Sequence, residues 1–274
     1  MWDPARYREF GSERSRPFFD LISRISAAEP ALVADVGCGP GELTAELSRR
    51  WPAAEVVGVD SSAEMIAAAN EGLAGLRAPV PVGAAAAGQA AVRPGLRFEF
   101  CDARDWQPGR PPDVIVSNAM LQWIPGHSEL LIRWLGQLAE GGWLAFQLPG
   151  NFDQPPHMLL RELASSPRWR SLLGEIRLNR QAADPAEYVD LLARAGCAAE
   201  AWETTYLHVL AGEDPVLRWY EGSGLRPVIA ALDPGQQEEF LAEYGSLLRD
   251  AYPRAPYGTV FPFRRVFVVT HRTP

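Results

Sequence analysis

The sequence predicts an α/β fold with a mostly parallel sheet, and three observations support this prediction. From residue 32 onward, short apolar runs alternate with segments long enough to form helices. A glycine-rich turn directly follows the first apolar run, and an acidic residue, Asp60, stands at the end of the second. Strands separated by helices are typical of right-handed βαβ units, which place their strands parallel in one sheet.

In the first half of the chain the apolar runs have the continuous hydrophobicity of buried strands. Helices are expected after the first two runs, over residues 42–51 and from Ser61 onward. The strands are expected at residues 32–36, 55–59, 96–101, 113–117 and 142–148.

In the second half the pattern becomes mainly helical. The helical block between the last two predicted strands is too long for a simple connection, so we expect it to form a lid. The last strand is expected to run antiparallel within the sheet. Helices are predicted at residues 156–165, 184–194, 214–221 and 235–251, and strands at residues 199–208 and 261–270.

Residues 78–95 differ from the rest of the chain. The segment contains Pro79, Pro81 and Pro94, a run of four alanines and one charged residue. It has neither turn signals nor an amphipathic period, so we expect a mobile surface insertion.

Composition and charge narrow the possible function classes. The 34 acidic and 26 basic residues give a formal charge of −8, and every basic residue is an arginine. This acidity argues against charge-driven binding to nucleic acid. No apolar run approaches the roughly 20 residues that span a bilayer, and the N-terminus lacks a signal segment. We therefore expect a cytoplasmic protein that does not bind membranes.

The cysteines and histidines are scattered along the chain. Cys38, Cys101 and Cys197 lie far apart, so their spacing indicates neither a disulfide framework nor a zinc site. The four histidines are equally dispersed. We therefore expect a protein without a metal.

The most informative segment is residues 35–41, which runs from the first predicted strand into the first helix. Gly37, Gly39 and Gly41 allow the backbone to bend sharply and to approach a ligand. The helix N-terminus beyond them offers free N–H groups and positive potential. Asp60, nineteen residues after Gly41, can accept hydrogen bonds from both hydroxyls of a ribose, or can simply cap the next helix.

Two adenosine cofactors compete for this motif. A nicotinamide dinucleotide places its pyrophosphate on the helix N-terminus, where this chain has Glu42, a carboxylate that would repel it. The glycine spacing instead resembles motif I of the class I S-adenosylmethionine (AdoMet) methyltransferases. AdoMet has no phosphate and carries an ammonium group, so an acidic turn suits it. The resemblance implies a Rossmann-like sheet and AdoMet as cofactor.

The same resemblance implies further cofactor contacts. Asp102 matches the family acid that accepts from the adenine amino group, with the Ala103 N–H facing the ring, although Asp102 could also cap a turn. Asn118 matches the position whose backbone carbonyl holds the methionine ammonium. The candidate cofactor-binding residues are Asp35, Gly37, Cys38, Gly39, Gly41, Asp60, Ser61, Met65, Asp102, Ala103 and Asn118.

A closer resemblance is to the trans-aconitate methyltransferases. Segments 13–17, 118–123, 202–206 and 224–227 carry it, and it runs from Met1 to the final strand. It implies an enzyme that transfers the AdoMet methyl group to one carboxylate of trans-aconitate and forms a monomethyl ester. The cofactor motifs are shared by many activities, so the substrate assignment depends on the lid segments.

With this resemblance the chain divides into four expected parts. Residues 1–30 form an N-terminal helical segment over the cofactor site, and residues 31–206 form the AdoMet-binding core. Residues 207–260 form the helical lid, and residues 261–274 add the final core strand.

Methyl transfer from a sulfonium to a carboxylate is an in-line displacement. The attacking carboxylate is already ionised at neutral pH because an ordinary carboxyl titrates at about 4, so neither a general base nor a metal is required. A tricarboxylate entering an acidic protein needs local cations, and arginine forks pair well with carboxylates. The candidate substrate-binding residues are Arg16, Gln122, Trp123, His157, Tyr206, His208, Arg226 and Arg265.

Several of these residues have a structural alternative. Each arginine could be an ordinary surface residue, and His157 could belong to the core or cap a helix. Tyr206 and His208 lie two apart on a predicted strand, so they share a face that could line the pocket or pack under the lid. Catalytic residues are not identified by the sequence.

Other functions also remain open at this point. A nicotinamide-dependent oxidoreductase and a catalytically silent AdoMet-binding regulator are alternatives from other classes. Within the methyltransferases, the acceptor could be another small acid or a natural product. The expected partner is a small polycarboxylate, and we expect a monomer or a weak homo-oligomer.

Overall fold

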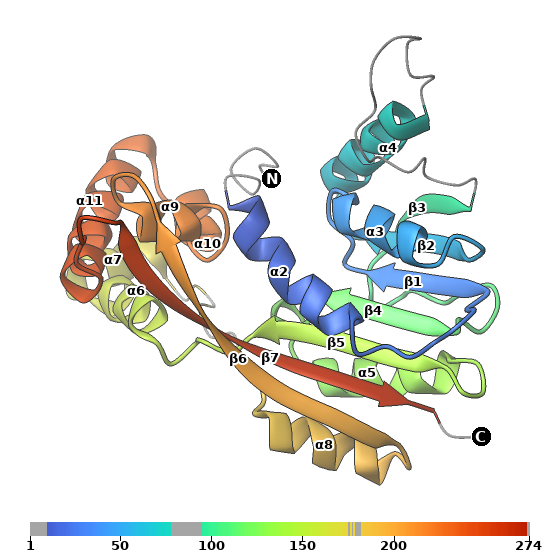
Figure 1. Ribbon diagram of the computed structural model, residues 1–274. Helices are drawn as coiled ribbons and strands as arrows, with labels where there is room; N and C mark the ends of the chain where they lie inside the picture. Colours follow the sequence, from blue (N-terminus) through green and yellow to red (C-terminus); the bar gives the residue numbers. More distant parts are fainter. Residues whose placement is uncertain (1–9, 78–94, 175, 177, 179–181, 273–274) are drawn as a thin grey trace.

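The computed structural model describes residues 10–77, 95–174, 176, 178 and 182–272. Its centre is a seven-stranded sheet in the order β3-β2-β1-β4-β5-β7-β6 (Figure 1). Strands β1 to β5 pair in parallel, and β7 runs antiparallel to both of its neighbours. The predicted mostly parallel sheet with an antiparallel last strand is therefore confirmed.

The strands lie within two residues of their predicted positions. The described strands are β1 (Leu32–Val36), β2 (Glu55–Asp60), β3 (Leu96–Phe100), β4 (Val114–Asn118), β5 (Trp143–Pro149), β6 (Ala198–Leu210) and β7 (Thr259–His271).

Several helices match the prediction, whereas no range was predicted for α5, for the 3₁₀ helix η1, or for α7 and α10, which have seven and six residues. The described helices are α2 (Gly11–Ile22), α3 (Glu42–Arg50), α4 (Ala63–Arg77), the 3₁₀ helix η1 (Leu121–Trp123), α5 (His127–Gln137), α6 (Pro155–Ser165), α7 (Pro167–Leu173), α8 (Pro185–Arg194), α9 (Pro215–Glu221), α10 (Arg226–Ala231) and α11 (Pro234–Ala251).

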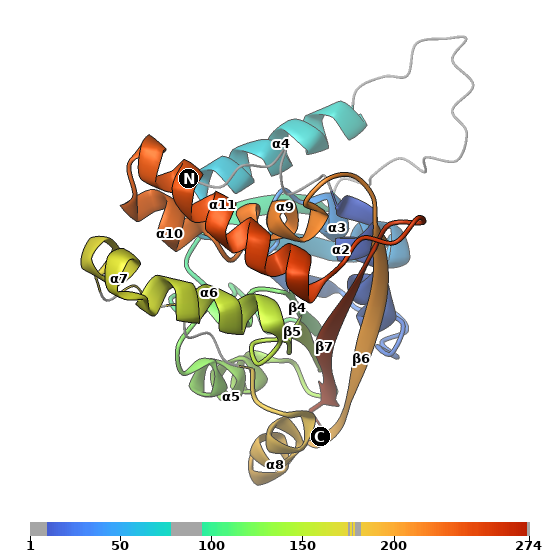
Figure 2. The same cartoon turned by 90° about the vertical axis from the view of Figure 1, so that its left-hand side faces the viewer.

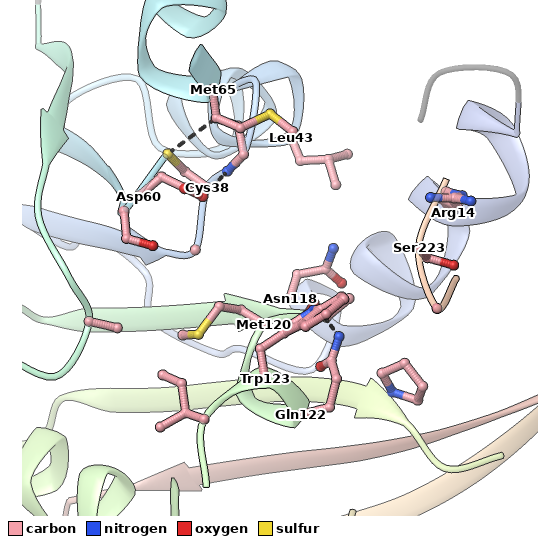
Figure 3. Close-up of a pocket in the computed structure, with 18 of the residues that line it drawn as sticks. Arg14, Cys38, Leu43, Asp60, Met65, Asn118, Met120, Gln122, Trp123 and Ser223 are labelled. Carbon is pink, nitrogen blue, oxygen red and sulfur yellow. Dashed lines mark hydrogen bonds between the residues drawn. The ribbon is translucent and has the colours of Figure 1, made fainter. Parts of the chain in front are cut away.

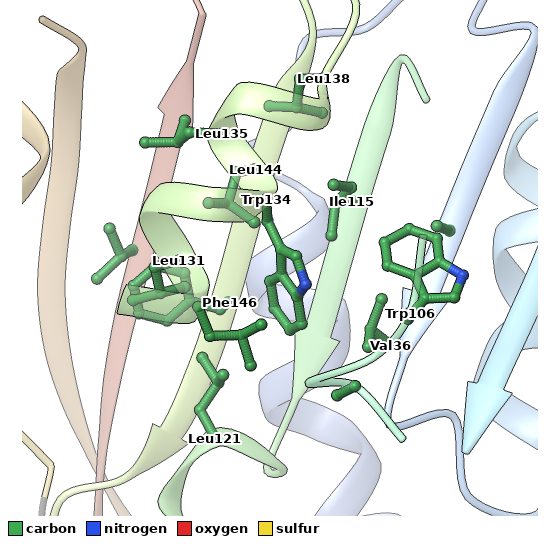
Figure 4. Packing of buried hydrophobic residues seen from close by; sticks show 14 of the residues in the cluster. Val36, Trp106, Ile115, Leu121, Leu131, Trp134, Leu135, Leu138, Leu144 and Phe146 are labelled. Carbon is green, nitrogen blue, oxygen red and sulfur yellow. The ribbon is translucent and has the colours of Figure 1, made fainter. Parts of the chain in front are cut away.

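Helices cover both faces of the sheet because successive strand residues point to opposite sides. Val33 on β1 packs with residues of α2 and α3, whereas its neighbour Ala34 packs with residues of α5 and α8. On the second face, Trp134 of α5 reaches over the sheet between Ile115 and Phe146 (Figure 4). Every residue of β1 is buried, as its apolar run predicts.

Strands β6 and β7 extend beyond the main sheet. The last pair that β7 makes with β5 is Arg265 with Pro149, whereas its pairing with β6 continues to Thr259. Residues 259–264 therefore belong to a two-stranded ribbon that leaves the core and reaches the helical lid (Figure 1).

The predicted helical lid is present. Helices α9, α10 and α11 share an apolar cluster with Phe261 and Phe263 of the ribbon, and the views in Figures 1 and 2 place them together at one end of the sheet. Helices α6 and α7 contribute Leu160 and Trp169 to the same cluster, although they precede the range expected for the lid. The boundaries between the four parts of the chain stay a prediction.

The predicted insertion at residues 78–95 lies outside the described residues, apart from Gly95. Among the residues that the structure describes, no helix is long and apolar enough to cross a bilayer.

We expect Trp134 to be a main determinant of stability. Its side chain is fully buried, so Trp134→Ala should lower the free energy of unfolding by about 3–5 kcal/mol through lost contacts and a cavity. Ile132→Ala is the matched control, because Ile132 lies on the same helix but is 37% exposed, and it should change stability by less than about 1 kcal/mol. Urea denaturation measures both, and equal effects would contradict the role of Trp134.

Candidate active site

A cavity of about 640 Å³ lies at the carboxyl edge of the sheet, between the core and the lid. It is lined by the segments that follow β1, β2, β3 and β4, and by residues of α2, α9 and β7. The strand order reverses between β1 and β4, and ligands of open α/β sheets bind in the crevice at such a reversal. Figure 3 shows the cavity from close by, with Asp60 and Met65 on one side and Arg14 and Ser223 on the other.

The glycine turn is shaped by two close packing contacts. Gly37 has φ +85°, and a Cβ there would lie 2.4 Å from Cγ of Met120. Gly41 has φ +81°, and a Cβ there would lie 2.5 Å from the Phe98 ring. Both positions therefore need glycine for conformation and for space. Gly37, Cys38 and Gly39 line the cavity, whereas Gly41 is not part of its described lining.

Asp60 lines the cavity and also orders the loops around it. Its Oδ2 accepts a hydrogen bond from the Gly39 N–H at 2.9 Å, and its Oδ1 accepts one from the Ser62 N–H at 2.8 Å. The helix cap that the sequence left open for Asp60 is made by Ser62 instead, whose hydroxyl accepts from the Met65 N–H at 3.3 Å, so Asp60 orders the turn just before the helix. An ionised carboxylate has about four acceptor sites, so Asp60 keeps capacity for a ligand.

Asp35 lies behind the loop rather than on the cavity surface. It is 2% exposed, and its Oδ2 accepts a hydrogen bond from the Thr44 hydroxyl at 2.7 Å. Burial raises the pKa of Asp35 to about 7, because a charged carboxylate is disfavoured away from water.

Asp102 and Ala103 also line the cavity, next to Arg104. The Arg104 guanidinium donates to both carboxylate oxygens of Asp102, at 2.9 and 2.6 Å. This pairing lowers the pKa of Asp102 and keeps it ionised. Ser61 and Met65, which follow β2, complete this end of the cavity.

The middle of the cavity is formed by the segment that follows β4. The Asn118 side chain accepts a hydrogen bond from the Gln147 amide, and the next residue, Ala119, has a left-handed backbone with φ +55°. Gln122 Nε2 donates to the Ala119 carbonyl at 2.6 Å, which fixes the turn. Asn118, Gln122 and Trp123 all line the cavity, as predicted from their place at the strand end.

Arginines gather at the other end of the cavity. Arg14 and Arg265 line it there, and Arg265 is only 4% exposed, whereas Arg226 lines the cavity near Glu64 of α4. Figure 3 shows Arg14 and Ser223 on the side opposite Asp60 and Met65.

His157 lines the cavity and is also packed as a core residue. Its ring lies 4.8 Å from the Phe152 ring and 5.1 Å from the Tyr220 ring, between centroids. His157 is therefore both a residue of the cavity lining and a buried residue packed against aromatic rings, which were two of the roles that the sequence left open.

Arg16, Tyr206 and His208 are candidates that the structure places outside the described lining of the cavity. The Tyr206 hydroxyl donates to Asp20 at 2.5 Å, and the exposed Arg16 guanidinium lies 5.3 Å from the Tyr206 ring centroid. His208 is buried and stacks between the rings of Tyr206 and Trp219. The shared face of this strand packs under α2 and α9, which was the structural alternative.

Burial also sets the charge of His208. Burial, and to a smaller extent the positive charge of Arg265, lowers the pKa of this side chain to about 4. His208 is therefore neutral at physiological pH.

Arg14 is a lining residue that the sequence reasoning missed. It lies on the buried face of α2, four residues from both Phe10 and Phe18, which are buried. Arg16 is two residues further and points elsewhere, because two helical residues are about 200° apart. The four-residue spacing of Phe10, Arg14 and Phe18 was the feature of the sequence that could have indicated the buried position of Arg14. Other lining residues that were not selected are Ser15, Met120, Asn151, Phe152, Trp219, Tyr220, Ser223 and Phe263.

Comparison with known proteins agrees with this geometry. Residues 10–201 match a family model described as a methyltransferase domain. A Streptomyces avermitilis protein named trans-aconitate 2-methyltransferase is 50% identical, and the match covers 99% of this chain and 97% of that one. Proteins of the same name from Rhodococcus jostii and Mycobacterium tuberculosis are 48% and 44% identical, each over 98% of this chain and over 98% and 96% of their own.

Solved structures show the same fold at low sequence identity. The YcgJ protein from a Bacillus is 14% identical, with a TM-score of 0.56 over 94% of this chain and 97% of that chain. A geranyl diphosphate C-methyltransferase from Streptomyces coelicolor is 17% identical, with a TM-score of 0.54 over 98% of this chain and 82% of that chain. The predicted class I methyltransferase fold is thereby confirmed, and the chain belongs to the methyltransferase family, together with the trans-aconitate 2-methyltransferases.

Proposed function

We propose that this enzyme methylates one carboxylate of trans-aconitate with AdoMet and releases the monomethyl ester. The observation that carries the proposal is the charge division of the cavity. Glu42, Asp60 and Asp102 line one end, and Arg14 and Arg265 line the other. A cationic cofactor and a polyanionic acceptor match these two ends, and relatives named for this reaction share 44–50% of the sequence.

The acidic end fits AdoMet. Asp60 has acceptor capacity for the ribose hydroxyls, and Asp102, whose side chain is 29% exposed beside Arg104, is the proposed acceptor for the adenine amino group. Glu42 opens α3 at the place where a dinucleotide would need to put a pyrophosphate, and it lines the cavity. When bound, AdoMet supplies an electrophilic methyl group on a sulfonium. Asp60, Asp102 and the Asn118 backbone are the residues proposed to hold it.

The chain's own contribution is orientation and exclusion of water. The acceptor carboxylate needs no base because it is ionised, so the arginines have to pair its other carboxylates and leave one free to attack. Met120, Trp123 and Phe152 give the lining apolar surface around the centre of the cavity. Holding two reactants in productive geometry can lower a barrier by about 7–11 kcal/mol.

The preferred acid, the cellular location and the assembly state belong to the same proposal. Turnover with a panel of di- and tricarboxylates, with mass detection of the ester, tests the acceptor. We propose a cytoplasmic enzyme that is a monomer or a weak homo-oligomer, and sedimentation analysis tests the assembly state.

Asp60→Ala should weaken AdoMet binding by about 1.5–3 kcal/mol, the range for hydrogen bonds to a charged group. It should also lower the melting temperature, since Asp60 accepts from two backbone N–H groups. Asp113→Ala is a matched control, because Asp113 accepts from the Ala31 and Leu32 N–H groups, before β1, at the opposite edge of the sheet. It should lower stability but leave AdoMet affinity unchanged. Calorimetric titration separates the two, and equal affinities for Asp60→Ala and wild type would refute the assignment.

Turnover at saturating AdoMet and acceptor should be flat between about pH 6.5 and 8.5, because carboxylates are ionised throughout this range. The His208 pKa of about 4 keeps this side chain neutral across the whole range. His208→Asn should therefore keep the flat profile. A rate that climbs tenfold per pH unit, and that is abolished in His157→Asn or His208→Asn, would show a general base and exclude a carboxylate acceptor.

AdoMet affinity, unlike turnover, should rise with pH. The raised pKa of about 7 leaves much of Asp35 protonated at neutral pH. A bound cation favours the ionised carboxylate and lowers this pKa, so Asp35 should contribute proton release on binding below about pH 8 and none well above it.

The amino group of the ligand also titrates in this range, so the control is the protein variant Asp35→Asn. Asparagine can still accept from Thr44 but cannot ionise. Calorimetry in phosphate and in Tris measures proton release, and a release that is the same in wild type and variant would disprove the role of Asp35.

A further inference from the structure

Arg14 and Arg265 are held on two neighbouring aromatic rings. The guanidinium carbon of Arg14 lies 4.8 Å from the Trp219 ring centroid, and that of Arg265 lies 4.4 Å from the Phe263 ring centroid. The two rings are themselves 5.3 Å apart between centroids. Cations over aromatic faces are stabilised by the ring electrons. The adjacent Trp219 and Phe263 rings therefore orient both arginines in one part of the cavity.

Each arginine is also fixed by the backbone around it. Arg14 belongs to α2, and its Nη2 donates to the Trp219 carbonyl of α9 at 3.1 Å, so it joins the N-terminal helix to the lid. Arg265 stands at the last pair of β7 with β5, where the ribbon leaves the main sheet. Both side chains are almost fully buried, with 8% and 4% exposure. The Arg14 guanidinium cannot move far without breaking its bond to α9, and that of Arg265 is confined by burial against the Phe263 ring.

The electrostatic surroundings of this pair favour an anion. Arg14 and Arg265 both present a permanently charged guanidinium to the same cavity, and such groups match a carboxylate ligand in charge and geometry. His208 lies beside Trp219 and is kept neutral, in part by the charges of Arg265 and Arg16, while Glu13 of α2 acts in the opposite direction. Arg226 also lines the cavity, but its charge is coupled to Glu64 of α4, on the cofactor side.

We propose that Arg14 and Arg265 together bind one carboxylate of the acceptor that is not methylated, and that they determine the preference for a third carboxylate. The inference rests on the proposed function and deepens it. Arg14 lies at the end of the cavity away from Asp60 and Met65 (Figure 3), so a carboxylate held there is remote from the methyl donor. Guanidinium N–H groups also occupy the lone pairs of the carboxylate that they bind, so this carboxylate is a poor nucleophile.

The test is a double-mutant cycle in which one change is made in the enzyme and the other in the acceptor. The probes are trans-aconitate and the three dicarboxylates in which one of its carboxylates is replaced by hydrogen. For wild type, loss of the paired carboxylate should lower kcat/KM by about 10- to 150-fold, the range for hydrogen bonds to charged groups. Arg14→Gln should raise the KM for trans-aconitate and should distinguish trans-aconitate from that dicarboxylate much less than wild type does, with Arg265 accounting for the discrimination that is left.

The controls address folding and general charge effects. Arg24→Gln removes another arginine that lies over a tryptophan ring, 5.3 Å from the Trp202 centroid and outside the described lining, and it should behave as wild type. AdoMet affinity should be unchanged in Arg14→Gln. If that variant does not fold, Arg14→Lys keeps the charge but loses the fork, and it should lose part of the discrimination.

Two results overturn the inference while leaving the proposed function intact. One is wild-type discrimination preserved in Arg14→Gln and Arg14→Lys, and the other is discrimination that depends on Arg16 instead of Arg14. A wild-type enzyme that methylates none of the four acids would overturn the proposed function and this inference with it.

Discussion

Because β1 pairs in parallel with both β2 and β4, the carboxyl ends of these strands meet at one edge of the sheet. The glycine turn after β1, Asp60 at the end of β2 and Asn118 at the end of β4 therefore lie close together in space, although they are far apart in the sequence. Gly37 and Met120, which follow β1 and β4, pack so closely that a Cβ at position 37 would lie 2.4 Å from Cγ of Met120. The position of the cavity and of its acidic end depends on this pairing.

The negative and the positive side chains of the site come from different elements of the fold. The carboxylates that line the cavity come from the parallel core, whereas Arg14 and Arg265 come from α2 and from the point where the ribbon begins. A protein of net charge −8 would repel a tricarboxylate at long range, so local cations in a desolvated cavity have to outweigh this repulsion. Screening weakens the distant charges much more than the buried pair, which favours binding at physiological salt.

Much of the fold could be predicted from the sequence because its signals are local. Apolar runs and the glycine turn mark the strand ends, and Asp60, Asp102 and Asn118 follow from their place after strands. The substrate end could not be predicted in the same way. Whether Arg14 or Arg16 faces the cavity depends on the rotation of α2 against the lid, which the buried Phe10 and Phe18 set. The face shared by Tyr206 and His208 was recognised, but the element that covers it is known only from the fold.

The buried arginines also show how stability and orientation are balanced in this fold. Removing a guanidinium from water is unfavourable, and for Arg14 the stacking on Trp219 and the hydrogen bond to the Trp219 carbonyl offset part of that cost. The free-energy cost of burying the guanidinium groups arises when the protein folds, before any acceptor arrives. Acceptor binding therefore does not have to order or dehydrate these groups again. An arriving carboxylate meets donors that are already oriented. The junction of the ribbon, the lid and the N-terminal helix can therefore select its ligand through donors whose orientation is set before binding.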